Sequence, residues 1–329
     1  MEQNRMKVVI CPRYGAPEIL QLTTLPEPIP RANELLIRVV ASTVNSGDVR
    51  VRGLQVQGWL RWVMRLVLGF SGPRQSVLGS VYSGIVCTTG DEVEGFQPGD
   101  EVFGMTGLRL GTHAEFITVK ASSAVAKKPW NASHEQAAAI VFGGATALHF
   151  LKKAKIDREF GKHVLIYGAT GSVGSSALQL ARIFGAQVTA VCSGAGIELA
   201  SALGAHAVVD YTQQDFRKMN KQYDLIFDAV GKINQKDCRH CLTPAGRFLS
   251  VNSLEMASET KEQLYFLREC FEKNQLSAVI DRQYQLEEIV EAHRYVDSGR
   301  KKGNVVLRLD VHGERGVERG EWREESGKW

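Results

Sequence analysis

The sequence predicts an α/β fold with a parallel sheet, joined to a second region that is rich in strands. From His163 to residue 231, short apolar runs typical of strands alternate with runs typical of helices. That spacing indicates βαβ units and a parallel sheet. Before residue 130, short runs rich in Val and Ile lie between proline and glycine turns, which indicates a mainly β region.

The length of the chain and the order of these patterns suggest the domain organisation. A chain of 329 residues is typical of two domains. We predict a mainly β domain at 1–130 that is completed by 279–309, where a strand–helix–strand pattern follows. The doubly wound parallel sheet is expected at 131–278. Half of the residues in 310–329 are charged, so a solvated, disordered tail is expected there.

Local patterns predict the individual elements in chain order. The early strands are expected at 7–10, 34–41, 77–87 and 114–119. Ser133 followed by Gln136 is a capping-box signature, so a helix should begin there. The later expected elements are strands at 163–167, 187–192, 207–211 and 223–228, helices at 172–184 and 196–204, and a final strand, helix and strand at 279–286, 287–299 and 304–309.

The strongest chemical signal is the turn from Tyr167 to Gly174, YGATGSVG, which follows an apolar strand and opens a helix. Gly171 lets a pyrophosphate approach the backbone, and Gly174 lets the helix pack closely on the strand. The free amides and the positive end of the helix dipole would then face the phosphates. Because a strand, a helix and a second strand surround the turn, we predict dinucleotide binding rather than a purely structural turn.

The residues after the second strand bear on the choice of nucleotide. NAD-selective folds usually place an acid there to hold the ribose 2′-hydroxyl, whereas this chain has Cys192 and Ser193. Ser193 and Tyr211 would line the pocket of a 2′-phosphate. No Arg or Lys lies between Ser193 and Glu198, and Arg182 is a more remote candidate. NADPH is therefore predicted, with NADH as the alternative.

Composition excludes several classes of function. The net charge of +4 comes from 40 basic and 36 acidic residues without a basic block, so nucleic acid is not expected as a partner. The segment 54–70 carries two arginines and is too short for a membrane span. We expect it to pack over the protein's own cleft, with a partner surface or membrane contact as alternatives. The absence of a signal-peptide pattern and the six scattered cysteines predict a cytoplasmic location.

Several separated motifs together resemble one family. They are Val44–Asp48 (VNSGD), Gly90–Val102 (GDEVEGFQPGDEV), Gly111–Phe116 (GTHAEF), Gly144–Ala147 (GATA), the turn above and Lys302–Val306 (KGNVV). In their order and spacing the chain resembles the zinc-independent medium-chain dehydrogenases/reductases of the quinone oxidoreductase (zeta-crystallin-like) group. That resemblance implies a GroES-like catalytic domain that clasps a Rossmann domain, with nicotinamide and substrate in the cleft between them.

The resemblance also implies a set of cofactor contacts. They would come from the VNSGD and GATA motifs, the phosphate turn and the ends of the sheet strands. The residues are Asn45, Thr146, Ala169, Thr170, Gly171, Ser172, Val173, Gly174, Ser193, Tyr211, Val230 and Gly231.

No zinc is expected. Zinc-dependent relatives carry a Cys where this chain has Asn45 or Ser46, and a His-Glu pair where it has Ser80 and Val81. A catalytic zinc needs Cys, His and carboxylate ligands that converge on one open site. The close pair Cys238 and Cys241 is assigned to a helix of the Rossmann domain.

Two departures from the family pattern matter. Val81 replaces a glutamate that is common in the group. After residue 251 the chain reaches the helical run KEQLYFLRECFEK within about ten residues, where many relatives insert a helix and a sixth strand. Without that strand the usual dimer across the sheet edge has nothing to pair with, so a homodimer stays an open alternative.

Without a metal ion, a conjugated acceptor such as a quinone or enone is expected, because its developing negative charge is spread over several atoms. Asn45 and Tyr82 are the candidate donors to the acceptor oxygen. Their alternatives are a loop cap for Asn45 and a core aromatic for Tyr82. Asp48 is the third candidate, as a residue that orients the loop. His113 and His149 are expected to be structural.

The sequence therefore favours an NAD(P)H-dependent oxidoreductase that transfers hydride to a quinone, an enone or another activated carbonyl. One alternative is a zinc-free alcohol or aldehyde oxidoreductase. The other is a nucleotide-sensing or RNA-binding protein with little turnover.

Overall fold

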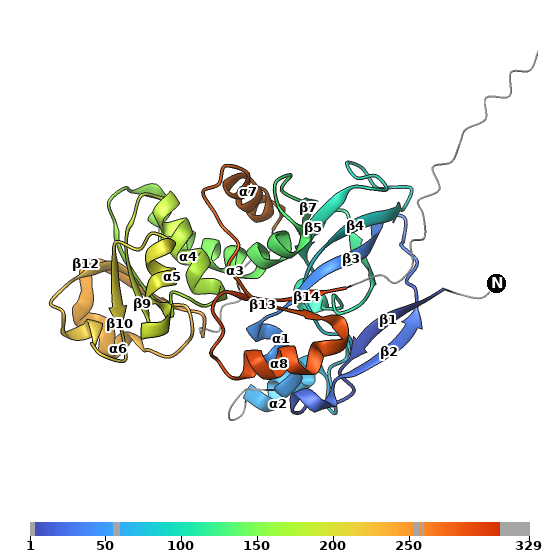
Figure 1. The fold of residues 1–329 in the computed structure, drawn as a ribbon, viewed down its shortest axis with the longest axis horizontal. Coiled ribbons are helices and arrows are strands. Elements are labelled where there is room, and N and C mark those ends of the chain that lie inside the picture. The colour runs from blue at the N-terminus through green and yellow to red at the C-terminus, as the bar shows by residue number, and fades with distance from the viewer. Residues whose placement is uncertain (1–3, 55–59, 253–256, 258–259, 310–329) are drawn as a thin grey trace, which may run out of the picture.

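The protein is built around two sheets with a long helix between them, in a computed structural model that describes residues 4–54, 60–252, 257 and 260–309 (Figure 1). The first sheet has seven strands in the order β13-β14-β3-β4-β5-β7, with β6 paired to β3. These strands are β3 (Glu34–Val44), β4 (Val81–Thr89), β5 (Glu101–Met105), β6 (Phe116–Lys120), β7 (Val125–Lys127), β13 (Ile280–Gln285) and β14 (Asn304–Arg308). A separate pair, β1 (Arg5–Ile10) and β2 (Gln21–Pro26), lies beside them.

Strands from both parts of the sequence meet in the seven-stranded sheet. β14 pairs antiparallel with β3, with Val305 opposite Val44, and β13 pairs parallel with β14. Two short helices of this half are α1 (Ser46–Gly53) and α8 (Ile289–Asp297). The domain limits proposed above, 1–130 with 279–309 and 131–278, stay predictions.

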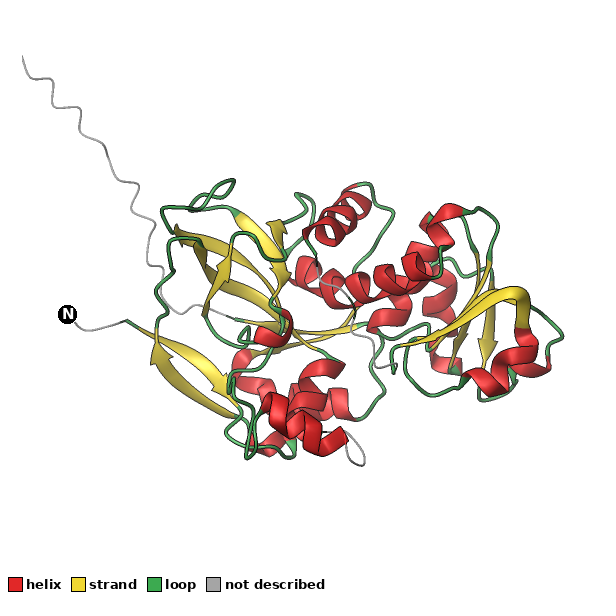
Figure 2. Ribbon diagram, turned by 180° about the vertical axis from the view of Figure 1, so that it is seen from behind, coloured by secondary structure: helices red, strands yellow, loops and turns green. Residues whose placement is uncertain are grey.

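The second sheet is parallel and has the order β10-β9-β8-β11-β12. Its strands are β8 (His163–Tyr167), β9 (Gln187–Cys192), β10 (Ala207–Asp210), β11 (Tyr223–Asp228) and β12 (Leu242–Ser250). Its helices are α4 (Ser172–Ile183), α5 (Ile197–Ala202) and α6 (Gln235–Cys238) (Figure 2). This confirms the predicted α/β fold class, a Rossmann doubly wound parallel sheet plus a GroES-like, mainly β part.

The outer strand on one side of the parallel sheet is β12. Within the described part of the chain no further strand pairs with it, and α7 (Lys261–Glu272) follows. The sixth strand of many relatives therefore has no counterpart among the described residues. Whether the protein forms a dimer stays untested.

The helix α3 (His134–Lys153) connects the two sheets. It begins as predicted: the Ser133 hydroxyl accepts from the Gln136 amide, and the Gln136 side chain accepts from the Ser133 amide at 2.9 Å. Its small residues allow close packing, since a Cβ at Gly143 would lie 2.3 Å from the Ser172 carbonyl oxygen. α3 thus brings the start of α4 against the first sheet.

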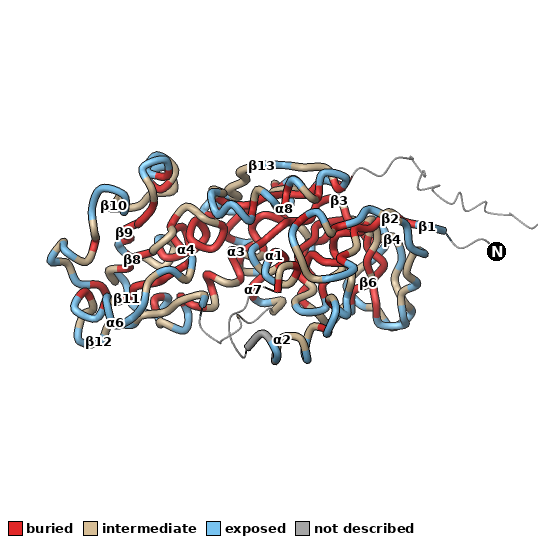
Figure 3. Tube along the Cα trace, turned by 90° about the horizontal axis from the view of Figure 1, so that it is seen from below, coloured by how far each residue is buried: buried red, intermediate tan, exposed pale blue. Residues whose placement is uncertain are grey.

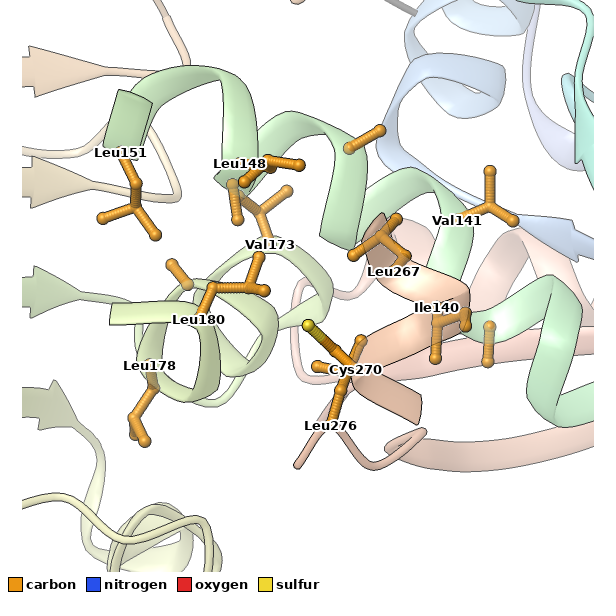
Figure 4. Close-up of a cluster of buried hydrophobic side chains, with 14 of the residues drawn as sticks. Ile140, Val141, Leu148, Leu151, Val173, Leu178, Leu180, Leu267, Cys270 and Leu276 are labelled. Atoms are coloured by element: carbon orange, nitrogen blue, oxygen red, sulfur yellow. The ribbon is translucent and has the colours of Figure 1, made fainter. Parts of the chain in front are cut away.

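One core cluster joins α3, α4 and α7 (Figure 4). In that view Ile140 of α3 lies close to Leu267 and Cys270 of α7, while Leu178 and Leu180 extend from α4. Figure 3 shows the buried residues concentrated along the strands and α3. The relative position of the two sheets is therefore fixed by apolar burial rather than by surface contacts.

The helix α2 (Leu60–Leu68) differs from its prediction. We expected the segment 54–70 to cover the protein's own cleft. Residues 55–59 lie outside the described part of the chain, and in the rest of the segment three large apolar side chains face outward. Trp62, Leu66 and Phe70 are between 58% and 65% exposed, and α2 lies at the periphery in Figure 3. No helix in the described part of the chain is long and apolar enough to cross a membrane.

Candidate active site

A cavity of about 530 Å³ lies between the two sheets. Its walls come from elements that are far apart in the sequence: the start of α1, the residue before β4, the middle of α3, the start of α4, the loop after β11 and the loop after α8. Such a cleft at the carboxyl ends of parallel strands is the usual ligand site of an open α/β sheet. The candidate active site is therefore this cavity.

The start of α4 forms one wall of the cavity through Gly171, Ser172 and Val173. The N-cap residue is Gly171, which has no side chain that could accept from the amides of the first turn of the helix. A Cβ at Gly171 would meet protein only at 3.7 Å, so its surroundings leave room for a ligand. The first amides of α4 therefore offer donors and a positive dipole end to an anion.

Other residues of the predicted phosphate turn hold its shape instead of facing the cavity. Ala169 is fully buried, and its amide donates to the Val191 carbonyl at 3.1 Å. At Gly174 a Cβ would lie 2.1 Å from the Gly168 carbonyl oxygen, so the helix packs directly on the turn. The Thr170 carbonyl accepts from the Gly303 amide at 2.7 Å, which ties the turn to the last strand region. A cofactor contact by Ala169, Thr170 or Gly174 stays a prediction.

The predicted ribose residues lie outside the cavity at the carboxyl ends of neighbouring strands. Ser193 follows β9, and Tyr211 follows β10 with half of its surface exposed. The Tyr211 amide donates to the Cys192 carbonyl at 3.0 Å, so the ends of the two strands stay together. The ring centroids of Tyr211 and Tyr167 lie 6.1 Å apart. Ser193 and Tyr211 are thus placed for an extended ligand that leaves the cavity over this edge.

The loop after β11 carries Val230, which lines the cavity, and Gly231. The buried carboxylate of Asp228 holds this loop, since it accepts from the Val230 and Gly231 amides at 3.2 and 2.8 Å and from the Ile233 amide at 3.2 Å. Asp228 was not among the residues predicted from the sequence. Its signal is an acid directly after the apolar run 225–227, at the last position of the strand.

Asn45 lines the cavity and caps α1. Its side-chain oxygen accepts from the amides of Gly47 and Asp48 at 2.7 and 3.2 Å, and its amide nitrogen donates to the Ser80 hydroxyl at 3.1 Å. Asn45 therefore acts as a loop cap, which was the alternative role expected for it, and it lines the cavity as well. Since the amide nitrogen has two hydrogens, one is left for a ligand. The hydroxyl of Ser80, which also lines the cavity, accepts from Asn45 and can donate its own proton into the cavity. Ser80 was not among the residues predicted from the sequence.

Asp48 closes the same capping box, where its carboxylate accepts from the Asn45 amide at 2.8 Å. It is 1% exposed. Burial raises the pKa of Asp48 to about 7, against the two backbone hydrogen bonds that lower it. Its place in the cap supports the prediction that Asp48 orients the loop.

The raised pKa of Asp48 gives a pH dependence. Because the folded state binds this proton more tightly than the unfolded chain, the stabilisation present below pH 4 is lost as pH rises towards 7. The loss would be on the order of 4 kcal/mol at most. In Asp48→Asn this contribution disappears, so its free energy of unfolding should fall less than that of the natural chain between pH 4.5 and 8. Urea unfolding of both proteins at several pH values measures this, and parallel pH profiles would contradict it.

Tyr82 does not lie at the cavity. Its side chain is fully buried in the core of the first sheet, and a Cβ at Gly104 would lie 2.7 Å from its hydroxyl oxygen. Burial raises its pKa. The position before β4, two residues earlier, faces the cavity instead. The core-aromatic alternative fits this structure, and we leave Tyr82 out of the proposed donors.

His113 is fully buried, and its Nε2 lies 3.1 Å from the Thr43 carbonyl oxygen. Burial lowers its pKa to about 4, which keeps the ring neutral at pH 7. The ring of His149 packs edge-on against Phe150 at 5.2 Å between centroids. Neither histidine is among the residues that line the cavity.

Two lysines that the sequence analysis passed over line the cavity, Lys232 and Lys301. The Lys301 ammonium donates to the Gly303 carbonyl at 2.8 Å. Burial lowers the pKa of Lys301 to about 8, while the nearby carboxylate of Asp281 acts in the opposite direction. Together with Arg50 of α1, which also lines the cavity, these lysines give it an excess of positive charge.

The described residues contain no group of three or more His, Cys, Asp or Glu side chains placed to hold a metal ion. Cys238 and Cys241 are buried beside the parallel sheet. Burial raises the pKa of both thiols, to about 11 for Cys238. Both are therefore thiols at pH 7.

Comparisons with known proteins agree with this architecture. Residues 31–130 match the family model described as alcohol dehydrogenase GroES-like domain, and residues 172–292 match the one described as zinc-binding dehydrogenase. The chain is 29% identical to the 2-methylene-furan-3-one reductase of Solanum lycopersicum, over 92% of this chain and 79% of that protein. It is 37% identical to the mitochondrial NAD(P)H oxidoreductase RTN4IP1 of Mus musculus, over 69% of this chain and 60% of that protein.

Among solved structures, the quinone oxidoreductase from Coxiella burnetii superposes with a TM-score of 0.84 at 27% identity, over 93% of this chain and all of that one. Two family models that match strands of both sheets, together with structural similarity over 93% of the chain, lead to one conclusion. The chain belongs to the medium-chain dehydrogenase/reductase family of oxidoreductases.

Proposed function

We propose that this protein is a metal-independent reductase that transfers hydride from NADPH to a quinone, an enone or another activated carbonyl. The observation that carries the proposal is the cavity itself, because it is lined both by the start of α4, which no side chain caps, and by the hydrogen-bonded pair Asn45 and Ser80. A relative from Solanum lycopersicum is named for the reduction of an enone, 2-methylene-furan-3-one, and one from Homo sapiens is named quinone oxidoreductase.

The residues present fit a dinucleotide. The free amides of Ser172 and Val173 would hold the diphosphate, with Lys301 as a cation that also lines the cavity. Ser193 and Tyr211 would hold the ribose end, and Thr146 and Val230 the nicotinamide end. When bound, the nicotinamide would supply the hydride.

The protein's own contribution is positioning and charge stabilisation. The side chains of Phe142, Phe150 and Val296 give the cavity apolar walls, which exclude water and hold a flat acceptor in place. The Ser80 hydroxyl, oriented by Asn45, donates a hydrogen bond to the acceptor oxygen as negative charge develops there. Hydrogen bonds alone can stabilise this negative charge most effectively when conjugation in the acceptor also delocalises it. Activated carbonyls are therefore the proposed substrates.

The substrate class is tested with a panel of quinones, enones, aldehydes and simple alcohols, while the absorbance of the reduced cofactor is followed at 340 nm. Turnover of quinones or enones, with little activity on simple alcohols, is expected. Tight NADPH binding without turnover of any acceptor would contradict the proposal and support a nucleotide-sensing protein. A cytoplasmic location stays a prediction.

Ser80 is tested by Ser80→Ala, which should lower kcat by about tenfold to a hundredfold, because one donor to the developing oxyanion is lost. The affinity for NADPH should change by less than threefold, since the proposed cofactor contacts do not include Ser80. Ser83→Ala is the matched control: Ser83 is buried like Ser80, but it lies on β4 itself, its hydroxyl donates to the Val102 carbonyl at 3.1 Å, and it does not line the cavity. Equal kcat values for the two variants would remove Ser80 from the mechanism.

A further inference from the structure

We propose that Lys302, on the segment between α8 and β14, supplies the positive charge that recognises the 2′-phosphate of NADPH. The inference rests on the proposed function and names a residue that decides which cofactor is preferred. Lys302 lies more than a hundred positions from the loop that it would complete, in the part of the sequence that returns to the first sheet.

The loop between β9 and α5 needs such a charge. The adenosine ribose of a dinucleotide lies at the carboxyl end of the second strand in this fold, and here the loop 193–198 contains no Arg or Lys. Arg182, which the sequence suggested as a remote cation, does not serve it. Its guanidinium donates to the Leu203 carbonyl at 3.0 Å, after the end of α5.

Lys302 reaches this loop directly. Its ammonium donates to the Ala195 carbonyl at 2.5 Å. Ala195 is two residues after Ser193, so the ammonium lies within about 10 Å of the place where the ribose hydroxyls are expected, and the long lysine side chain can turn towards it.

The backbone around Lys302 is held on both sides. Its amide donates to the Asp281 carboxylate at 2.7 Å, and the next amide, of Gly303, donates to the Thr170 carbonyl at 2.7 Å. Gly303 also forms a bridge with Gly171 of the phosphate turn. The segment is therefore anchored on the same turn that would bind the diphosphate, and the position of Lys302 relative to a bound dinucleotide is defined.

An acid at the same edge makes this charge necessary. Asp210, the last residue of β10, faces the loop closely enough that a Cβ at Gly194 would lie 2.8 Å from its carboxylate. Asp210 acts to raise the pKa of the Cys192 thiol, whereas Lys302 acts to lower it, so both charges act at one place. Without Lys302, the negative field of Asp210 would disfavour a 2′-phosphate and leave the 2′-hydroxyl of NADH unaffected.

The neighbouring residue, Lys301, allows the effects of two adjacent lysines on cofactor binding to be compared. Lys301 lines the cavity near the start of α4, whereas Lys302 points to the loop after β9. Lys301 would therefore face the diphosphate, which NADPH and NADH share. Two adjacent lysines thus have separable expected effects, one on both cofactors and one on NADPH alone.

The experiment measures the dissociation constants of NADPH and NADH by calorimetry for the natural chain and four variants. Lys302→Ala should weaken NADPH about tenfold to a hundredfold and change NADH less than twofold, since one charge-assisted contact is lost. Lys302→Arg should retain the preference for NADPH. Lys301→Ala should weaken both cofactors by a similar factor. Lys236→Ala, in an exposed lysine of α6, should change neither.

Adenosine 2′,5′-bisphosphate and AMP locate the effect at the adenosine end, because they lack the nicotinamide. Lys302→Ala should weaken the bisphosphate and leave AMP unchanged. If Lys302→Ala alters NADPH and NADH equally, or neither, this inference is overturned while the proposed function stands. If the natural chain binds neither cofactor, the proposed function itself fails. Unchanged NADH affinity in Lys302→Ala also shows that the variant is folded.

Discussion

Replacing Gly174 with valine is expected to abolish NADPH binding, with an affinity loss of at least about a hundredfold. A Cβ at this position would lie 2.1 Å from the Gly168 carbonyl oxygen and 2.8 Å from the Ala169 Cα, and both are backbone atoms that no rotamer change can move. The start of α4 must therefore shift away from β8. Since the proposed diphosphate donors are the first amides of α4, a shift of about 1 Å misplaces all of them together.

Calorimetry with NADPH, on protein whose folding is checked by thermal unfolding, measures the effect. Ala177→Val is a control for added volume on α4, because residue 177 is buried on the same helix about one turn after Gly174. It should lower stability and leave the affinity of the folded protein nearly unchanged. A folded Gly174→Val protein with the natural affinity would contradict the whole assignment of the site.

The parts of this fold that the sequence predicted are those with local causes. The parallel sheet follows from strand and helix periodicities within about 70 residues, and α3 begins at the capping box of Ser133 and Gln136. The close packing at Gly174 is likewise visible in a short motif. In each case the residues that determine the structure are near neighbours in the sequence.

The errors and omissions have long-range causes. Tyr82 and Ser80 are two residues apart, so alternation along a strand cannot distinguish them. They differ because Tyr82 is paired within β4, opposite Ser42 and Gly104, whereas Ser80 lies just before the strand begins. The outward face of α2 could not be told from a buried one, because an amphipathic pattern does not say which side packs on protein. Lys302 reaches Ala195 only after the chain has returned through β13 to the first sheet.

The second large effect concerns stability, and it arises where α1 is held against α8. The guanidinium of Arg52 on α1 is 2% exposed and donates to the Asp297 carboxylate at 2.6 Å and to the Gly15 carbonyl at 3.1 Å. It also lies 3.1 Å from Nδ1 of His293. Burial, and then the nearby His113 and Arg52, lower the pKa of His293 well below its usual value, so its neutral ring can accept from Arg52.

Asp297→Ala should therefore cost about 3 kcal/mol of the free energy of unfolding, because the guanidinium stays buried without its carboxylate. Adding Arg52→Met should recover part of this loss, since an apolar side chain of similar length replaces the buried charge. Urea unfolding at pH 7 measures all three proteins. Because α1 carries the Asn45 cap that lines the cavity, Asp297→Ala should also lower kcat.

The same helix provides the control for an exposed ion pair. Arg294 of α8 pairs with Glu18 at 2.7 Å, but both side chains are about half exposed. Glu18→Ala should cost much less of the free energy of unfolding than Asp297→Ala, because solvent screens the pair. If Asp297→Ala cost no more than Glu18→Ala, the Arg52 cluster would behave as a surface ion pair, and α1 would have to be held by its apolar contacts alone. The distinction matters for the site, because a buried charge cluster fixes the orientation of α1 in a way that interchangeable apolar contacts do not.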